Sequence, residues 1–454
     1  MNRFDAGRHH RALAGPTPSL RRLAGVLLLA VASATTVAAT SGCAGIGPHP
    51  GGSQATDWPR SGGFSAEALK RIDDYVNTDI AGGVIPGAAL VIVRDDRVIH
   101  ERLWGVRDPA TRAPMTMDTI FRIYSMTKPI TSVAAMMLVE EGRLGLQDPV
   151  SQYIPAFRDV KVGVEKKGAD GKLALELEAP KRQMTIQDLL RHTSGLTYGF
   201  FGEGLVKNAY RDAGLSGTDV DNREFAERLA RLPLMFQPGT TWEYSHATDV
   251  LGRVIEVVSG KSLGAFFNER LFDPLGMTRT GFAVTDPQRQ PLLAEPNAND
   301  RTFGPGTEFF DPRKPTRWES GGGGLMSTAS DYLRFLRMIV NGGTLDGRRY
   351  LSPMSIQLMA ANHIAPAAPP VPGPYYSPGP GFGFGLGFAV RIEPGAAPQL
   401  GNVGELNWSG AGGTAFWIDP DERMIVVYMM QSPSQRARYR IALRNMIYGA
   451  MTVP

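Results

Sequence analysis

Strand-like segments lie near both ends of this chain, with a long helical section between them. Residues 87–106 contain two runs of strand-forming residues about an Asp-Asp turn, and three further runs follow at 382–392, 413–419 and 423–430. Runs joined by short turns predict antiparallel pairing. The simplest assembly is therefore one five-stranded antiparallel sheet built from both ends of the chain.

Helical periodicity fills most of the remaining sequence. It predicts the following helices: 65–80 with Ser65 as its cap, one from Ser125 to near Gly142, 184–196, 249–272, 329–343 and roughly 435–450. Residues 160–180 predict a hairpin about a Gly-Ala-Asp-Gly turn, and the Pro/Gly-rich residues 364–381 predict irregular structure. The fold class predicted is α/β (α+β), with helices on both sides of the sheet and a mostly helical domain inserted.

The first 42 residues are typical of an export signal. They hold five Arg and one acidic residue, and residues 23–39 form an apolar run that is short for a spanning helix. Cys43 follows Thr-Ser-Gly, which is similar to the small triplet before a lipidated cysteine, although Thr40 stands where Leu is usual. Lipidation of Cys43 and cleavage after Ala39 both remain open. We expect an exported protein, periplasmic or lipid-anchored to the bacterial cell envelope, with a flexible tether at 43–63.

The charge balance argues against a nucleic-acid partner. The net charge of +4 disappears when residues 1–42 are removed, because bases and acids are then equal in number. The single cysteine, Cys43, allows no disulfide within the chain. With no His-Glu-x-x-His pair, cysteine cluster or Walker-type loop, the sequence predicts no metal and no cofactor.

Ser125 and Lys128 form the first candidate catalytic pair. They are three residues apart at the start of an apolar helix, and Ser and Lys at this spacing share one face. A serine at a helix N-terminus gains a positive local field and an amide that can bind an oxyanion. Desolvation of an amine in such a helix favours its neutral, proton-accepting form. As a lone motif the pair also fits a capping serine beside a surface lysine.

Ser262 is the rival nucleophile, because it lies in the only Gly-x-Ser-x-Gly motif, at residues 260–264. A nucleophile elbow requires a strand before the serine and a helix after it. Both flanks of Ser262 have helical spacing instead, so we interpret it as a joint between helices.

Two further segments could supply the general base or acid and the second oxyanion-hole amide that a serine nucleophile needs. Tyr244 precedes a helix, and a tyrosine beside a lysine can serve as general base or acid, although a packed aromatic is the commoner reading. Residues 407–413 open a strand with small residues, which permit close approach of a ligand to the backbone. An amide from this segment could complete an oxyanion hole with the amide of Ser125.

Six ordered segments together resemble the serine β-lactamase-like family, and most closely its family VIII carboxylesterases. They are YSMTK, LLRHTSGL, PGTTWEYS, LFDPLGMTRT, GGGGLMSTASDYLRF and WSGAGGTAFWIDP, spread between about residues 64 and 450. The resemblance implies one serine hydrolase domain at 64–454, with an α/β part at 64–144 and 321–454 and a helical part at 145–320, as in β-lactamases and transpeptidases. It also implies Ser125 as acyl-accepting nucleophile, Lys128 and Tyr244 as proton-transfer partners, and an oxyanion hole from the amides of Ser125 and Ala411.

Two positions depart from the β-lactamase pattern. His246 stands where the tyrosine motif usually has Asn, and Trp408 stands where the third motif usually begins with Lys. The resemblance implies that Trp408, Ser409, Gly410 and His246 line the substrate site. Since Trp408 cannot pair with a carboxylate and offers an apolar wall, a neutral ester fits better than an anionic β-lactam.

The leading hypothesis is a serine carboxylesterase that takes short acyl esters through an acyl-enzyme. One alternative is a β-lactamase or D-alanyl-D-alanine peptidase acting on β-lactams or peptidoglycan. Another is a catalytically silent envelope binding protein that uses the same cleft. The histidines give little support to a rival Ser-His-Asp triad. His192 is interpreted as a structural residue at a helix end, and His100 and His363 have no catalytic residues around them. His246, next to Tyr244, could line the pocket, and proton transfer by it is the minor alternative.

Overall fold

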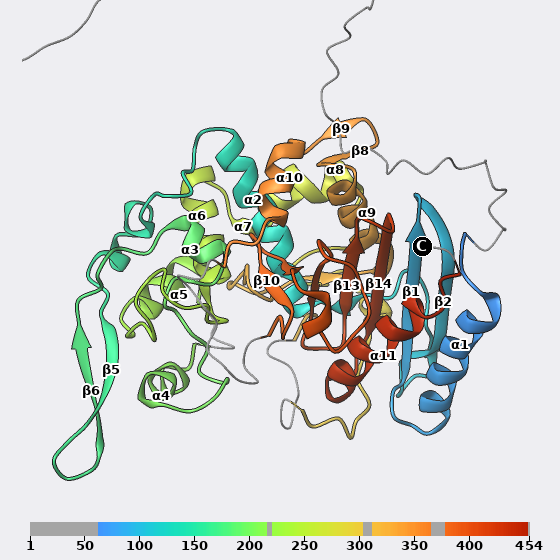
Figure 1. The fold of residues 1–454 in the computed structure, drawn as a ribbon, viewed down its shortest axis with the longest axis horizontal. Coiled ribbons are helices and arrows are strands. Elements are labelled where there is room, and N and C mark those ends of the chain that lie inside the picture. Colours follow the sequence, from blue (N-terminus) through green and yellow to red (C-terminus); the bar gives the residue numbers. More distant parts are fainter. Residues whose placement is uncertain (1–61, 216–219, 303–310, 365–376, 453–454) are drawn as a thin grey trace, which may run out of the picture. The chain divides into compact units, whose positions relative to one another are not determined.

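The computed structural model describes residues 62–215, 220–302, 311–364 and 377–452, which lie within one compact unit, residues 57–454 (Figure 1). The predicted export signal, Cys43, nearly all of the tether and most of the Pro/Gly-rich stretch at 364–381 lie outside the described residues. Within the described ranges, no helix has the length and apolar character needed to cross a membrane.

One antiparallel sheet, in the order β10-β11-β12-β13-β14-β1-β2-β3, carries the fold. Its strands are β1 (Gly87–Arg94), β2 (Arg97–Asp108), β3 (Ala113–Pro114), β10 (Phe382–Phe384), β11 (Ala389–Arg391), β12 (Leu406–Ser409), β13 (Ala415–Asp419) and β14 (Met424–Met430). The two ends of the chain meet inside the sheet, where β1 pairs with β14 and Ala88 lies opposite Met430. The prediction of one antiparallel sheet from both ends is confirmed.

The predicted number of five strands is wrong, because the described residues already form eight strands in this sheet. Residues 382–392 form two strands instead of one, since the chain turns at Gly385 and at Gly387, whose φ is 95°. The prediction also omits β12 and β3, which are only four and two residues long. Alternation over so few residues does not stand out in a sequence. The turn between β1 and β2 is as predicted, with Asp95 and Asp96 in left-handed backbone conformations of the type that close two-residue hairpins.

Helices cover both faces of the sheet. The α-helices are α1 (Ala66–Ala81), α2 (Thr127–Glu140), α3 (Ile186–Leu190), α4 (Leu205–Asp212), α5 (Asn222–Leu229), α6 (Ala247–Ser259), α7 (Leu263–Phe267), α8 (Asp273–Leu275), α9 (Ala329–Val340), α10 (Pro353–Ala360) and α11 (Arg436–Tyr448). Leu90 and Ile92 of β1 share a hydrophobic cluster with α1 and α11, whereas Val91 and Val93 share one with α2 and α9. Alternate residues of one strand thus pack against two helical layers.

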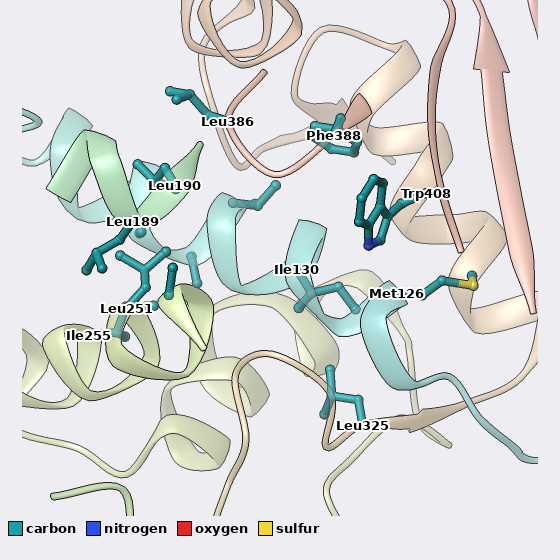
Figure 2. Close-up of a cluster of buried hydrophobic side chains, with 14 of the residues drawn as sticks. Met126, Ile130, Leu189, Leu190, Leu251, Ile255, Leu325, Leu386, Phe388 and Trp408 are labelled. Carbon is teal, nitrogen blue, oxygen red and sulfur yellow. The ribbon is translucent and has the colours of Figure 1, made fainter. Parts of the chain in front are cut away.

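The second of these clusters extends from the sheet into the helical section. Every residue of α2 from Thr127 to Leu138 is buried, as expected of a helix surrounded by protein. Figure 2 shows α2 with Leu251 of α6 on one side and Trp408 of β12 on the other, and both belong to the cluster that includes Ile130. The sheet and the helical section therefore share one core around α2.

The helix predicted at 184–196 is mostly wrong, since α3 ends at Leu190. Thr185 caps it by accepting a hydrogen bond from the Asp188 amide, and the side chain of Asp188 accepts one from the Thr185 amide. The chain then turns sharply at His192, where φ is 59°. This turn sends the following residues toward the candidate site instead of continuing the helix.

The single helix predicted at 249–272 is divided at Gly260, where φ is 75°. The side chain of Ser262 then caps α7 by accepting a hydrogen bond from the Ala265 amide at 3.2 Å, and a π-helical segment, η4 (Asn268–Phe272), follows. Ser262 therefore lies at a joint between helices, as predicted.

The remaining strands form small ribbons. β5 (Val162–Lys167) and β6 (Leu173–Glu178) make the predicted hairpin, which extends from the helical section in Figure 1. β4 (Phe121–Arg122) pairs with β7 (Met326–Ser327), and β8 (Thr344–Leu345) pairs with β9 (Arg348–Arg349). β4 precedes Ser125 in the chain, and its pairing with β7 joins the segment that leads into Ser125 to residues 326–327.

We expect Asp188→Asn to lower the free energy of unfolding at pH 7 by about 3 kcal/mol, because the buried carboxylate accepts hydrogen bonds from Arg182, Thr185 and Thr193. Burial alone would raise the pKa of Asp188, but these hydrogen bonds hold it below its ordinary value of 3.8. Because the carboxyl pKa is lower in the folded state, the carboxylate stabilises the fold at any pH above its ordinary pKa. This stabilisation is lost as the pH falls through the pKa of the folded state. Urea titrations should show the difference between variant and wild type shrinking in acid.

Asp74→Asn on the exposed face of α1 is the control, with an expected change of less than about 0.5 kcal/mol. An Asp188→Asn difference that stays the same from neutral to acid pH would contradict the assignment.

Candidate active site

Ser125 lies in a short 3-10 turn, η1 (Tyr124–Met126), which leads directly into α2. Tyr124, the residue before it, has φ of 44°, a left-handed conformation that is uncommon for a tyrosine. Strained backbone of this kind persists where the surrounding structure holds it, and it clusters at functional sites. Ser125 remains partly exposed, unlike its neighbours Tyr124 and Met126.

Lys128 is the most deeply buried cation near Ser125, with only 1% of its surface exposed. Its Nζ donates to Ser125 Oγ at 3.2 Å, to Tyr198 Oη at 3.2 Å and to the Gly322 carbonyl oxygen at 2.7 Å. An ammonium has three N–H donors, so these three acceptors match its full capacity. The predicted Ser125–Lys128 pair is thus in contact, and Lys128 is held from three separate parts of the chain.

Tyr244 also adjoins Lys128, but through its ring. Lys128 Nζ lies 4.5 Å from the centroid of the Tyr244 ring, within the range of a cation–π interaction. The Tyr244 side chain is 8% exposed, and its hydroxyl has no hydrogen-bond partner among the described residues. A buried hydroxyl without a partner is available to a bound substrate or to a proton in transfer.

Tyr198 is the residue that the sequence prediction missed. Its hydroxyl accepts a hydrogen bond from Lys128, and its ring lies 5.3 Å from the Tyr244 ring. Burial raises the pKa of Tyr198 well above its usual value, and the nearby Tyr244 and Asp249 add to this shift. Tyr198 is therefore a neutral phenol that anchors Lys128. No spacing between motifs in the sequence predicts this contact. Tyr198 lies 70 residues from Lys128, and the backbone turn at His192 brings it close.

The glycine-rich turn after β12 packs against the backbone that leads into Ser125. A Cβ on Gly410 would lie 2.3 Å from the carbonyl oxygen of Ile123, and one on Gly412 would lie 2.8 Å from the Tyr124 ring. Only glycine permits this approach. The turn is closed by a hydrogen bond from the Gly413 amide to the Gly410 carbonyl.

Ala411 is at the second position of that turn. Among the described residues no hydrogen bond is recorded for its amide, so the N–H is available to a ligand. Ser409, the last residue of β12, accepts a hydrogen bond from Arg440 Nη1 at 3.2 Å. The segment predicted to complete an oxyanion hole with the Ser125 amide therefore lies beside Ser125.

An aromatic wall borders the site. Trp408 is buried, with its ring 5.4 Å from Tyr244 and 5.3 Å from Phe384, and its Nε1 has no partner among the described residues. Phe200 stacks on Tyr198 at 4.7 Å and is 52% exposed, so the wall continues to the protein surface. The position that would carry a lysine in the β-lactamase pattern is thus occupied by an apolar ring.

The histidines of the described residues do not contact Ser125 through any recorded hydrogen bond. His192 is buried against Tyr244, and burial together with Lys128 keeps its pKa well below the usual value. His246, predicted to line the substrate site, pairs through Nδ1 with Asp249 at 3.1 Å, and its ring packs 4.3 Å from Tyr198. Of these two neighbours, Tyr198 holds Lys128, and the His246 ring also packs 5.3 Å from the Phe225 ring.

Three comparisons place the chain among known proteins. The Beta-lactamase family model matches residues 72–448. Esterase EstB of Burkholderia gladioli is 31% identical over 409 residues, which cover 85% of this chain and 96% of that protein, and Protein Rv1367c of Mycobacterium tuberculosis is 38% identical over 361 residues, which cover 77% and 86%. The solved structure of EstCE1, a hydrolase with promiscuous acyltransferase activity, superposes with a TM-score of 0.69 at 29% identity, covering 84% of this chain and 98% of that chain.

Lys128→Met should slow the reaction of Ser125 with a fluorophosphonate by at least about a hundredfold, because it removes a positioned proton-transfer partner of the serine. Labelling rates followed by intact-protein mass spectrometry measure the effect. Lys207→Met is the matched control, since Lys207 is also buried and pairs with Glu243 at 2.7 Å. Equal labelling rates for Lys128→Met and wild type would exclude Lys128 from activation of the serine.

Proposed function

The chain belongs to the beta-lactamase family and is a serine hydrolase, and on that premise we propose that it cleaves carboxylic esters with short acyl chains. The observation that carries the choice of ester is Trp408, which packs against Tyr244 where the β-lactamase pattern has a lysine. An indole gives a neutral acyl ester an apolar surface and gives a carboxylate no counter-charge. The similarity to Esterase EstB supports the same choice.

In the proposed reaction, Ser125 Oγ attacks the ester carbonyl carbon and forms a tetrahedral intermediate. Lys128 Nζ, 3.2 Å from Ser125 Oγ, and Tyr244 are the proton-transfer partners. The developing oxyanion accepts hydrogen bonds from the amides of Ser125 and Ala411. Collapse breaks the bond to the alcohol oxygen, and the alcohol leaves with the proton that Ser125 gave up.

The second half of the proposed reaction releases the acyl group. Water gives a proton to the same pair and attacks the acyl-Ser125 ester, and the acid product leaves as Ser125 regains its proton. Tyr244 suits this exchange because its buried hydroxyl has no partner among the described residues and is therefore free to bind water or alcohol. Tyr198, whose phenol stays neutral and holds Lys128, has the supporting role.

Ser125→Ala is expected to lower kcat/KM for p-nitrophenyl acetate by at least about a thousandfold, because it removes the nucleophile. A p-nitrophenyl series from acetate to octanoate, run beside nitrocefin, defines the acyl preference. Ser262→Ala is the control, with turnover close to wild type, because Ser262 caps α7. Equal ester turnover by Ser125→Ala and wild type would refute the proposal. A wild type that neither turns over esters nor reacts with fluorophosphonate would favour the silent binding protein.

One observation favours a second candidate, a hydrolase of β-lactams or of D-alanyl-D-alanine peptides. Arg440 of α11 donates to Ser409, beside Trp408 and Gly410, and no ion pair to an acid is recorded for it in the described residues. Burial lowers the pKa of Arg440, and the neighbouring Arg444 and Arg436 add to the shift. A guanidinium placed this way can bind the carboxylate that such substrates carry.

For this second candidate, we expect Arg440→Met to reduce the ratio of nitrocefin to p-nitrophenyl acetate kcat/KM by about tenfold, the value of one charge-assisted hydrogen bond. Arg438→Met is the control, because Arg438 pairs with Asp79 of α1 instead of Ser409. A ratio that does not change, or a wild type without nitrocefin turnover, would leave the ester as the supported substrate.

A further inference from the structure

We propose that Asp249 is a positioning residue for the reaction, which fixes the turn that carries Gly322 so that the Gly322 carbonyl holds Lys128 beside Ser125. The inference rests on the proposed function, since it gives Asp249 a part in activating the same serine. Asp249 lies in the first turn of α6, five residues after Tyr244, and only 4% of its surface is exposed.

The carboxylate of Asp249 contacts three partners. Its Oδ1 accepts hydrogen bonds from Ser320 Oγ at 2.5 Å and from the Gly322 amide at 3.0 Å, and its Oδ2 lies 3.1 Å from His246 Nδ1. Gly322 is held by its amide on one side, and its carbonyl accepts from Lys128 Nζ at 2.7 Å on the other. One residue thus connects the buried carboxylate to the buried amine.

The turn at 320–324 is clamped between two helices. Thr131 of α2 donates to the Gly321 carbonyl at 2.7 Å, and a Cβ on Gly321 would lie 2.7 Å from the Thr248 carbonyl of α6. A Cβ on Gly322 would lie 2.8 Å from Asp249 Oδ2. The glycines therefore let the backbone approach Asp249 and Lys128 closely enough to join them.

The negative charge of Asp249 also supports its role in positioning Lys128. Burial by itself would raise the pKa of Asp249, but the hydrogen bond and charge of His246, the charge of Lys128 and the hydrogen bond of Ser320 lower it. The carboxylate is therefore ionised and offsets part of the cost of burying the Lys128 cation. The titratable groups that face Asp249 among the described residues are His246 at the N-cap of α6, Lys128 on α2 and Tyr198 on the segment after α3.

The test compares Asp249→Asn with Asp249→Ala. The amide of Asn can still accept from Gly322 but lacks the charge, whereas Ala lacks both. We expect kcat for p-nitrophenyl acetate to fall about tenfold in Asp249→Asn and further in Asp249→Ala, with KM within about twofold. The pH–rate profile of Asp249→Asn should also differ from that of the wild type, because the substitution removes a negative charge from the hydrogen-bonded network that holds Lys128.

Asp331→Asn is the matched control, because Asp331 is also 4% exposed in the first turn of a helix, α9, and its partners, Thr280 and the Arg279 amide, lie outside the site. It should lose a similar amount of thermal stability and keep the wild-type kcat and pH profile. An Asp249→Asn enzyme with wild-type kcat and pH profile would overturn the proposal, and so would an equal loss of kcat in Asp331→Asn.

Fluorophosphonate labelling separates this proposal from the proposed substrate. The labelling rate of Ser125 should fall about tenfold in Asp249→Asn whether or not esters are the substrate, since labelling needs only the activated serine. A wild type that labels but cleaves no ester would contradict the ester alone. Labelling of Asp249→Asn at the wild-type rate would contradict the role of Asp249 alone.

Discussion

The burial of one amine explains the arrangement of the site. Lys128 lies on a helix that is apolar on nearly all sides, where an unpaired cation would be strongly destabilising. Its three acceptors come from the turn before α2, from the segment after α3 and from the glycine turn at 320–324. Each of these segments lies outside the α-helices and the main sheet, and each is held in place by its own hydrogen bonds. The site is therefore built around satisfying Lys128, and Ser125 benefits as one of its three partners.

The parts of the site that are local in sequence could be predicted, and the parts that depend on long-range contact could not. Ser125 and Lys128 are one helical turn apart, so spacing alone brings them together. The run of glycines at 410–413 is visible in the sequence and indicates a close backbone approach. The structure contains such an approach between Gly410 and the Ile123 carbonyl. Tyr198 and Gly322, however, lie 70 and 194 residues from Lys128. No spacing rule connects residues so far apart.

In the fold, too, the elements defined by local sequence could be predicted and those defined by long-range contacts could not. The long strands β1, β2 and β14 and the capped helices α1 and α9 follow their sequence patterns, because many alternating or periodic residues define each one. The short strands β3 and β12 are defined by their neighbours in the sheet, which the sequence does not display. At α3 the helical pattern continues in the sequence. Asp188 instead accepts hydrogen bonds from four side chains and from the Thr185 amide, which favours an early helix end and a turn at His192. Tertiary contacts there prevail over local propensity.

The pairing of β1 with β14 has a consequence for how the protein is made. β1 is complete after residue 94, but its partner is not synthesised until residues 424–430. During translation the β1–β2 hairpin leaves the ribosome with one edge unpaired and with apolar side chains on both faces of β1. Long-range pairing of this kind also slows folding, because the intervening chain must be ordered first. The β1 edge of the nascent hairpin thus stays unpaired until β14 is synthesised, and the sheet closes only when this last strand is available.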